Sequence, residues 1–561
     1  MRFLNARRTI FFFATALLLF GQCFLSSSAA AQGGEPQYFA IRGAKVFPVS
    51  GPPIEDATVI VARGVILAVG GKEIPIPADA WVIEGKGLTV YPGLFDALTD
   101  VGIPAAPSVQ SEGGTRNSQP SSKGPEDRPG STPWRSAANE ASLSDKRIES
   151  WRNAGFTTVV SAPKSGFFPG QAAVLDLAGD RNGDLVVKSP VAIPVSLNPS
   201  GSFASGFPDS KMGALGYVHQ VWLDTEWSTR AQASYEKNPR AAARPRYDRV
   251  EAALADALDH HALVLIPANN VVDLRRALVL VDRWKVSGVI VGAQMAYELP
   301  DEIAAKKLPV LVNLKWPEVE KDADPDDVPS LRDLRFRDRA ASSPAALAKA
   351  GAKFAFTSDG ITAPADILKA AKKSVDAGLT PDAALRALTL SPAEIFGVAD
   401  RTGSIEKGKI ANLLVTDGDL FNEKTKIKMV FVDGRKFEIR EPATPKDPPK
   451  GDLTGKWKLS YTTPEGAEES TVDLTMAKDG TLSGTVSSGK RGTATIISGY
   501  LSAEKFSFVI NIPIGQEPAD VTFSGTLDKD SMKGTISVQS FSTEFTGTRP
   551  SAVPPSTGGA L

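Results

Sequence analysis

Apolar and polar residues first alternate with the short period of β-strands. Between residues 38 and 90, brief apolar runs such as Thr58-Val59-Ile60-Val61 and Val65-Ile66-Leu67-Ala68-Val69 are separated by turn residues. Arg63-Gly64, between these two runs, predicts a tight hairpin turn. Residues 403–439 repeat the same β-rich pattern far along the chain.

From residue 146 the pattern changes to apolar runs that alternate with helical segments. Continuous apolar runs of this kind are typical of buried parallel strands, and their alternation with helices predicts a β/α barrel or an open α/β sheet. Residues 142–153, 271–284 and 345–349 are helical in type, and about 203–250 predicts a helical hairpin or decoration. The strand candidates are residues 154–160, 191–195, 263–266, 288–291, 310–313 and 354–357.

A separate all-β unit is predicted at residues 452–549. Short alternating strands recur there every 8–12 residues, as in Trp457-Lys458-Leu459-Ser460-Tyr461, and Asp479-Gly480 and Asp528-Lys529-Asp530 mark hairpin turns. This spacing predicts a meander that closes into a barrel or a sandwich. The proline-rich residues 441–451 are the expected linker before it.

Residues 103–145 are rich in proline, serine, glycine and charge. Such a composition buries too little apolar surface to order itself, so we expect a mobile insertion after the first strand of the α/β region. Its position at the mouth of a barrel is compatible with a lid or with a tolerated insertion.

The first 31 residues have the organisation of a secretory signal. Arg2, Arg7 and Arg8 precede the apolar run 10–20, and Ala29-Ala30-Ala31 offers a cleavage site. We therefore expect an exported bacterial protein, periplasmic or extracellular. Its mature chain would have no disulfide, because the single cysteine is Cys23. No later stretch is apolar enough to span a membrane.

Chain length and net charge limit the kinds of binding partner that are expected. With 561 residues the chain should form several domains, and its net charge of −1 gives no field that would favour nucleic acid. A small molecule or another exported protein is the expected partner. The chain contains only three histidines.

Pro92-Gly93-Leu94-Phe95-Asp96 and the segment 378–415 resemble the amidohydrolase superfamily, in its imidazolonepropionase- and dipeptidase-like branch. The resemblance implies a TIM-type β/α barrel at 91–403. It also implies a discontinuous β-sandwich made of residues 38–90 and 404–440, with Asn412 where relatives carry aspartate. In the last unit, Gly455, Trp457 and Arg549 resemble a lipocalin-like barrel whose arginine packs on the tryptophan.

The same resemblance implies hydrolysis of carbon–nitrogen bonds other than peptide bonds, on divalent ions held by histidines and an aspartate. The first two histidine positions hold Leu98 and Asp100, and those after the fifth and sixth strands fall near Asn269 and Gln294. Only the aspartate position is kept, at Asp359, which is the candidate catalytic residue. A zinc-type site is therefore not supported.

The remaining histidines do not replace the missing ligands. His219 is expected on a helix surface or in a packed core, and His260-His261 at the last turn of a helix. Ser358 has no histidine base and no nucleophile-elbow context, so a serine nucleophile is rejected. In this family frame Asp96 is a structural residue.

Three hypotheses follow. The first is a catalytically degenerate amidohydrolase that acts as an exported binding protein. The second is an active hydrolase with a carboxylate-rich site in which Asp100 and Asp359 bind a hard divalent ion beside Leu98, Asn269 and Gln294. In the third, the large barrel is a scaffold and the C-terminal β domain binds the ligand.

Overall fold

The computed structural model describes residues 38–104, 128, 130–197, 208, 210–241, 243–319, 328–439, 447–463, 466–489, 492–514, 517–538 and 541–549. The chain divides into two compact units, 1–439 and 440–561, which are described separately. The predicted signal at 1–31 lies outside the described residues, as do most of the linker and residues 105–127 of the predicted insertion. Among the described residues, no helix has both the length and the apolar character needed to cross a membrane.

The first sheet joins the two ends of unit 1. Its strand order is β16-β15-β14-β5-β1-β2-β3, with β4 paired to β1. The two segments predicted to form a sandwich thus share one connected sheet, in which β5 pairs with β14. The strands are β1 Tyr38–Val46, β2 Ile54–Ala62, β3 Val65–Gly70, β4 Trp81–Glu84, β5 Thr89–Pro92, β14 Leu413–Thr416, β15 Ile427–Val432 and β16 Arg435–Glu438.

The predicted hairpin turn at Arg63-Gly64 is confirmed. Ala62 pairs with Val65 across it, and both turn residues have positive φ, 50° and 80°. Gly64 is needed there because a Cβ would lie 2.6 Å from the Asp433 carboxylate.

The second sheet has the order β13-β12-β11-β10-β9-β8-β7-β6. Strands β9 to β13 are parallel, as predicted, and β6 is parallel to β7. The strands are β6 Leu94–Thr99, β7 Phe156–Ser161, β8 Ala172–Asp176, β9 Val186–Pro194, β10 Leu263–Ala268, β11 Gly288–Gly292, β12 Val310–Asn313 and β13 Phe354–Thr357.

Strand β8 corrects the expectation of a uniformly parallel sheet. It runs antiparallel to both β7 and β9. All five of its residues are buried. The sequence pattern does not predict a strand between Gly170 and Leu177, because the apolar run there is brief and no helical pattern precedes it.

The edge strands β6 and β13 of this sheet come together. Thr357 Oγ1 donates to the Leu98 carbonyl at 2.6 Å, and the Ser358 N–H donates to Asp96 Oδ1 at 3.0 Å. Each of these two bonds joins a side chain to the backbone. The sheet is therefore curved enough to bring its first and last strands side by side.

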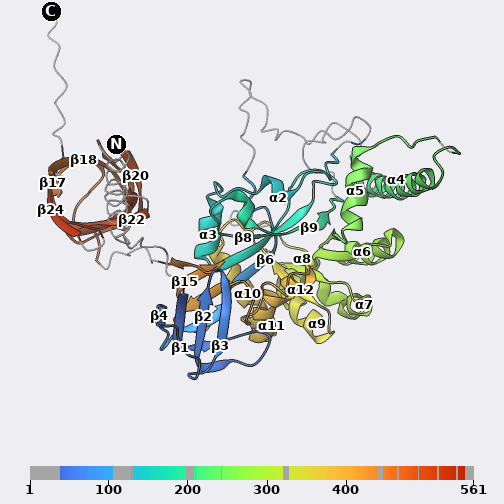
Figure 1. Ribbon diagram of the computed structural model, residues 1–561, viewed down its shortest axis with the longest axis horizontal. Coiled ribbons are helices and arrows are strands. Elements are labelled where there is room, and N and C mark those ends of the chain that lie inside the picture. Colours follow the sequence, from blue (N-terminus) through green and yellow to red (C-terminus); the bar gives the residue numbers. More distant parts are fainter. Residues whose placement is uncertain are drawn as a thin grey trace, which may run out of the picture. The chain divides into compact units, whose positions relative to one another are not determined.

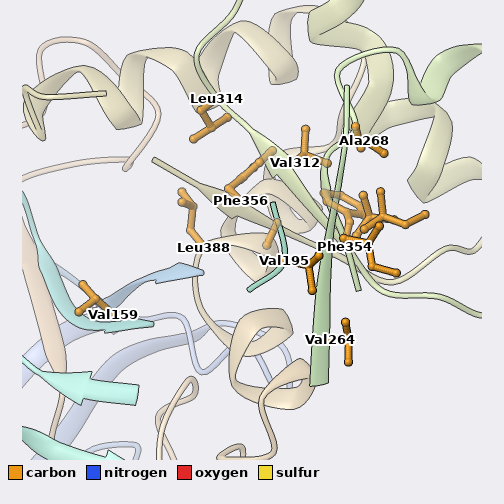
Figure 2. Packing of buried hydrophobic residues seen from close by; sticks show 14 of the residues in the cluster. Val159, Val195, Val264, Ala268, Val312, Leu314, Phe354, Phe356 and Leu388 are labelled. Carbon is orange, nitrogen blue, oxygen red and sulfur yellow. The ribbon is translucent and has the colours of Figure 1, made fainter. Parts of the chain in front are cut away.

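Each strand of the curved sheet supplies side chains to two apolar clusters. Val264, Val312 and Phe356 belong to a cluster on one face, and Figure 2 shows these side chains among their neighbours. Leu265, Leu311 and other alternate residues belong to a second cluster, which also contains Phe396 from just after α12. The period of two along each strand thus assigns one face to the helices and the other to the interior of the curve.

Helices follow the strands of this unit (Figure 1). They are α2 Ala137–Glu140, α3 Arg147–Asn153, α4 Lys211–Lys237, α5 Arg249–Asp259, α6 Val271–Trp284, α7 Pro300–Ala305, α8 Leu331–Arg339, α9 Ser343–Lys349, α10 Ala365–Asp376, α11 Pro381–Ala387 and α12 Leu390–Ile395. Short 3₁₀ turns are η1 Asn182–Leu185, η2 Ala296–Glu298 and η3 Ala340–Ser342.

Two helical expectations are confirmed and three need correction. Val271–Trp284 is a helix, and the helical hairpin predicted within 203–250 corresponds to α4 and α5. The helix expected from residue 142 begins only at Arg147. The capping-box-like spacing of Ser391-Pro392-Ala393-Glu394 predicts a helix start at Ser391, but this residue lies inside α12 and is not its cap. The insertion expected to be mobile contains an ordered part, since Thr132 N–H donates to the Phe168 carbonyl at 2.8 Å.

Unit 2 is a closed antiparallel barrel of eight strands (Figure 1). The strands are β17 Gly455–Thr463, β18 Gly466–Met476, β19 Leu482–Ser488, β20 Gly492–Ser502, β21 Lys505–Ile514, β22 Glu517–Asp528, β23 Ser531–Val538 and β24 Phe541–Thr548. Pairing of β17 with β24 closes it. Its core is aromatic: the Phe508 and Phe523 rings stack with centroids 4.8 Å apart. The predicted contact of Arg549 with Trp457 is confirmed at 4.6 Å from the ring centroid.

Candidate functional site

The candidate site lies where the parallel strands of the curved sheet end. Asp100 follows β6, Lys164 follows β7, and Asp359 follows β13. Because β6 is parallel to β7 and contacts β13, the carboxyl ends of these strands meet and bring the three side chains together. Binding residues of α/β barrels gather at this end of the strands.

Lys164 joins the two candidate carboxylates. Its Nζ lies 3.4 Å from Asp100 Oδ1 and 3.2 Å from Asp359 Oδ1. Partial burial acts to lower the pKa of Lys164, but the charges of Asp359 and Asp100 outweigh it and raise that pKa above its ordinary value. The side chain is therefore an ammonium at neutral pH, and it is neither a general base nor a free nucleophile.

Arg147 is a second cation that contacts Asp100. Arg147, the first residue of α3, donates from Nη1 to Asp100 Oδ1 at 3.1 Å and from Nη2 to the Asp100 carbonyl at 2.9 Å. Its Nη2 also lies 2.8 Å from Asp145 Oδ2. Burial acts to raise the pKa of Asp145, yet the hydrogen bonds from Arg147 and the Gly102 N–H hold it below its usual value.

Asp96 has a different role from Asp100, although both belong to the β6 region. It is fully buried and accepts hydrogen bonds from the Ser358 N–H and hydroxyl, the Leu98 N–H and the Trp151 indole. Burial raises its pKa to about 6 in spite of these donors. Asp96 therefore ties β6 to β13 and α3 from inside the core. Ser358 is a partner of this carboxyl group and is itself buried, 2% exposed.

A cavity of about 340 Å³ opens beside Lys164 and Asp359. Its walls are mainly apolar, and Leu98 is among them. The other lining residues are Thr99, Ala162, Pro163, Ser165, Gly166, Phe167, Pro169, Pro194, Val195, Ser196, Leu265, Pro267 and Val291. The volume is in the range of small-molecule sites.

Asn269 and Gln294 do not line this cavity. The Asn269 side chain lies against Gly292 instead. A Cβ added to Gly292 would lie 1.9 Å from the amide oxygen of Asn269. The Gln294 side chain donates to the Lys315 carbonyl, and the backbone carbonyl of Gln294 accepts from the Ser343 hydroxyl at 2.8 Å. Gln294 thus connects its loop to Lys315 and Ser343, whereas Asp100 and Asp359 converge on Lys164.

The donor set does not fit the divalent site that the resemblance implies. Two carboxylates converge, but a lysine ammonium lies between them, and Leu98 offers no donor. Within the described part of the chain, no three histidine, cysteine, aspartate or glutamate side chains gather as a metal site requires. His219 instead accepts the Trp284 indole N–H at 3.0 Å, and His260 is the C-cap of α5.

The sequence interpretation missed Lys164 and Arg147. Lys164 comes three residues after β7, in Ser161-Ala162-Pro163-Lys164, at the site end of a correctly predicted strand. A search of every strand end for polar residues of any charge would have found it. Arg147 was hidden because its helix was expected to begin earlier.

Comparison with known proteins agrees with this fold. Residues 297–439 match the model of the amidohydrolase family. An amidohydrolase from Thermotoga maritima MSB8 is 23% identical over 71% of this chain and 100% of its own, with a TM-score of 0.59. Unit 1 thus has an amidohydrolase-like fold.

Two further structures are more distant. A putative prolidase from Bifidobacterium longum is 18% identical over 72% of this chain and 95% of its own, with a TM-score of 0.43. A zinc-bound adenosine deaminase from Xanthomonas campestris is 16% identical over 71% and 92%, with a TM-score of 0.39. The chain matches no curated protein.

Proposed function

We propose that the chain is an exported member of the amidohydrolase superfamily that binds a small molecule without a metal ion and does not hydrolyse it. In this proposal, residues 91–403 are a modified β/α barrel with β8 as its antiparallel strand. The single observation that carries it is the position of Lys164, whose ammonium contacts both Asp100 and Asp359.

An ammonium ion supplies positive charge but cannot do the work of the divalent ion. It has no vacant coordination position, so it neither binds water as a ligand nor lowers its pKa toward neutrality. For Asp359 to act as a general base, a water molecule must be held between its carboxylate and an electrophilic carbon. The Asp359 carboxylate instead contacts the Lys164 ammonium. The arrangement supports binding better than hydrolysis.

The cavity supports the binding part of the proposal. It combines apolar walls with one charged pair, Lys164 and Asp359, which is the usual composition of a small-molecule site. The oxygen-rich metal site, the second hypothesis, would require Lys164 to leave both carboxylates. The β-barrel of unit 2, the third hypothesis, has a core filled by side chains such as Trp457, Phe508 and Phe523.

Metal binding by the purified full-length chain tests the proposal. The chain is dialysed to equilibrium against Zn²⁺, Mn²⁺ or Mg²⁺, and the bound metal is measured by mass spectrometry. We expect no stoichiometric metal, and the same result for Asp100→Asn and Asp359→Asn. One bound ion per chain that is lost in both variants, but kept in the surface control Asp366→Asn, would overturn the proposal.

A further inference from the structure

The cavity beside Lys164 has an unusual distribution of charge. Of the described residues that line it, only Lys164 and Asp359 carry charge, and most of the others are apolar. Asp100 stands behind Lys164 and contacts the same ammonium. Lys164 therefore joins two carboxylates beside a cavity whose walls are mainly apolar.

Lys164 is held less firmly than the carboxylates it joins. Its side chain is 51% exposed, whereas those of Asp100 and Asp359 are 36% and 41% exposed. The two residues after it have positive φ, 84° at Ser165 and 105° at Gly166. A serine rarely adopts such a backbone, so the conformation of the loop that carries Lys164 is set by its surroundings and not by the local preference of Ser165.

Half-exposed ion pairs contribute little net stability, because the ammonium regains hydration when it leaves. The Lys164 side chain can therefore be exchanged for another cation. When Lys164 leaves, Asp359 loses its ammonium contact and Asp100 keeps only Arg147, which it shares with Asp145, so negative charge is in excess. The site thus favours a positively charged group in place of the Lys164 ammonium.

We infer that the cavity binds a small organic ammonium compound, whose charged head takes the place of Lys164 between Asp100 and Asp359 while its apolar body enters the chamber. This inference rests on the proposed metal-independent binding function. Lys164 then acts as a tethered competitor that closes the site when it is empty.

The ligand chemistry follows from the walls. Leu98, Leu265 and Val291 belong to the apolar interior of the curved sheet, and they suit an alkyl or aryl body. The Phe167 ring lies in the same lining and adds an aromatic surface. A carboxylate ligand would add a fourth negative charge to those of Asp100, Asp145 and Asp359, which only Lys164 and Arg147 balance, and this excess disfavours it.

Isothermal titration of the full-length chain with three six-carbon probes tests the inference. The probes are hexylammonium, 1-hexanol and hexanoate, each with a chelator present so that no metal contributes. We expect hexylammonium to bind at least about tenfold more tightly than 1-hexanol and hexanoate, because only it satisfies the carboxylates. Since these comparisons use the unaltered chain, they do not depend on the folding of any variant.

Variants then assign the binding to the site. Lys164→Met removes the competitor, and we expect hexylammonium to bind about fivefold more tightly. Asp359→Asn should weaken it by about tenfold or more. Lys349→Met, an exposed lysine at the end of α9 that does not line the cavity, is the matched control and should change nothing.

The outcomes separate this inference from the proposed function. Preferential binding of hexanoate, or equal binding of all three probes, would overturn the ammonium inference but leave metal-free binding intact. No binding of any probe, or binding unchanged in Asp359→Asn, would also overturn it. Binding of hexylammonium that requires a divalent ion would instead contradict the proposed function.

Discussion

Two cations of the chain determine the local chemistry of the site. Lys164 neutralises Asp100 and Asp359 from a loop, and Arg147 contacts both the side chain and the carbonyl of Asp100. These charges belong to the chain, so they compensate the two carboxylates whether or not an ion is bound. An ammonium supplies no Lewis acidity, which a metal ion would.

Asp176 is a buried carboxyl group whose protonation affects stability. It is fully buried at the end of β8, and burial raises its pKa to about 7, although Thr158 and Asn412 donate hydrogen bonds to it. The nearby Asp433 also raises this pKa, and Arg401 acts to lower it. Because the folded state holds this proton more tightly than the unfolded state, ionisation of Asp176 destabilises the protein as pH rises from about 4 to about 7.

Asp176→Asn should remove this pH dependence. The amide keeps the acceptor oxygen and cannot ionise, so its unfolding free energy should fall less between pH 4 and 7 than that of the unaltered chain. The difference has an upper slope of about 1.4 kcal/mol per pH unit. Chemical denaturation at several pH values measures it, and parallel curves for the two proteins would contradict the assignment. Asp96, whose pKa is about 6, remains in both and contributes equally.

At the scale of elements, Asp176 and Asn412 connect β8 to β14. Asn412 Nδ2 donates to Asp176 Oδ1 at 2.9 Å, and its oxygen accepts the Asp433 N–H at 2.8 Å. The resemblance to the amidohydrolase superfamily implies an aspartate at the position of Asn412. The neighbouring Asp176 gives the physical reason: a second carboxylate would share a buried site with the first, and like charges there are costly.

An exchange of the two side chains tests this link. Asn412→Asp alone should destabilise unit 1 by about 2–4 kcal/mol at pH 8, because it adds an unpaired buried charge. Adding Asp176→Asn to that variant should restore most of the loss, since one carboxyl and one amide face each other again. Stability is measured by urea denaturation of all four proteins. Additive effects in the double variant would show that the pair is not coupled.

The barrel of unit 2 is held where its first and last strands meet. Arg549 lies over Trp457, donates to the Asp452 carbonyl, and follows β24 directly. Trp457 is fully buried, and its indole N–H donates to the Leu453 carbonyl at 2.8 Å. These contacts join the segment before β17 to the end of β24.

Arg549→Met should therefore loosen the closure. We expect a loss of about 1–2 kcal/mol from the cation–π contact and the hydrogen bond. Hydrogen exchange in the full-length chain should become faster in peptides from β17 and β24. Lys533→Met, which removes an exposed lysine of β23, is the control and should leave exchange unchanged. Equal exchange in all three proteins would mean that Arg549 does not support the closure.

At the scale of the whole molecule, the sequence predicted most strands and the parallel direction of β9 to β13, but not the reversal of β8. Val310–Asn313 and Phe354–Thr357 are strands with the predicted bounds, because each is a short apolar run before a helical pattern. The reversal of β8 depends on pairing with β7 and β9, which is a long-range property that no local pattern encodes. The pairing of β5 with β14 was accessible only through the family resemblance.

The residues of the candidate site were also predictable only in part. Asp100 and Asp359 are candidates because the family resemblance implies ligand positions there, and the structure brings both to Lys164. Asn269 and Gln294 are candidates through the same resemblance. The Gln294 side chain instead donates to the Lys315 carbonyl and that of Asn269 lies against Gly292, because strand position alone does not determine side-chain direction.

The most direct test is a crystal structure of the full-length chain grown with zinc, with diffraction recorded at the zinc absorption edge. We predict continuous density for the Lys164 side chain between Asp100 and Asp359, and no anomalous peak there. An anomalous peak bonded to both carboxylates, with Lys164 turned away, would contradict the metal-independent site.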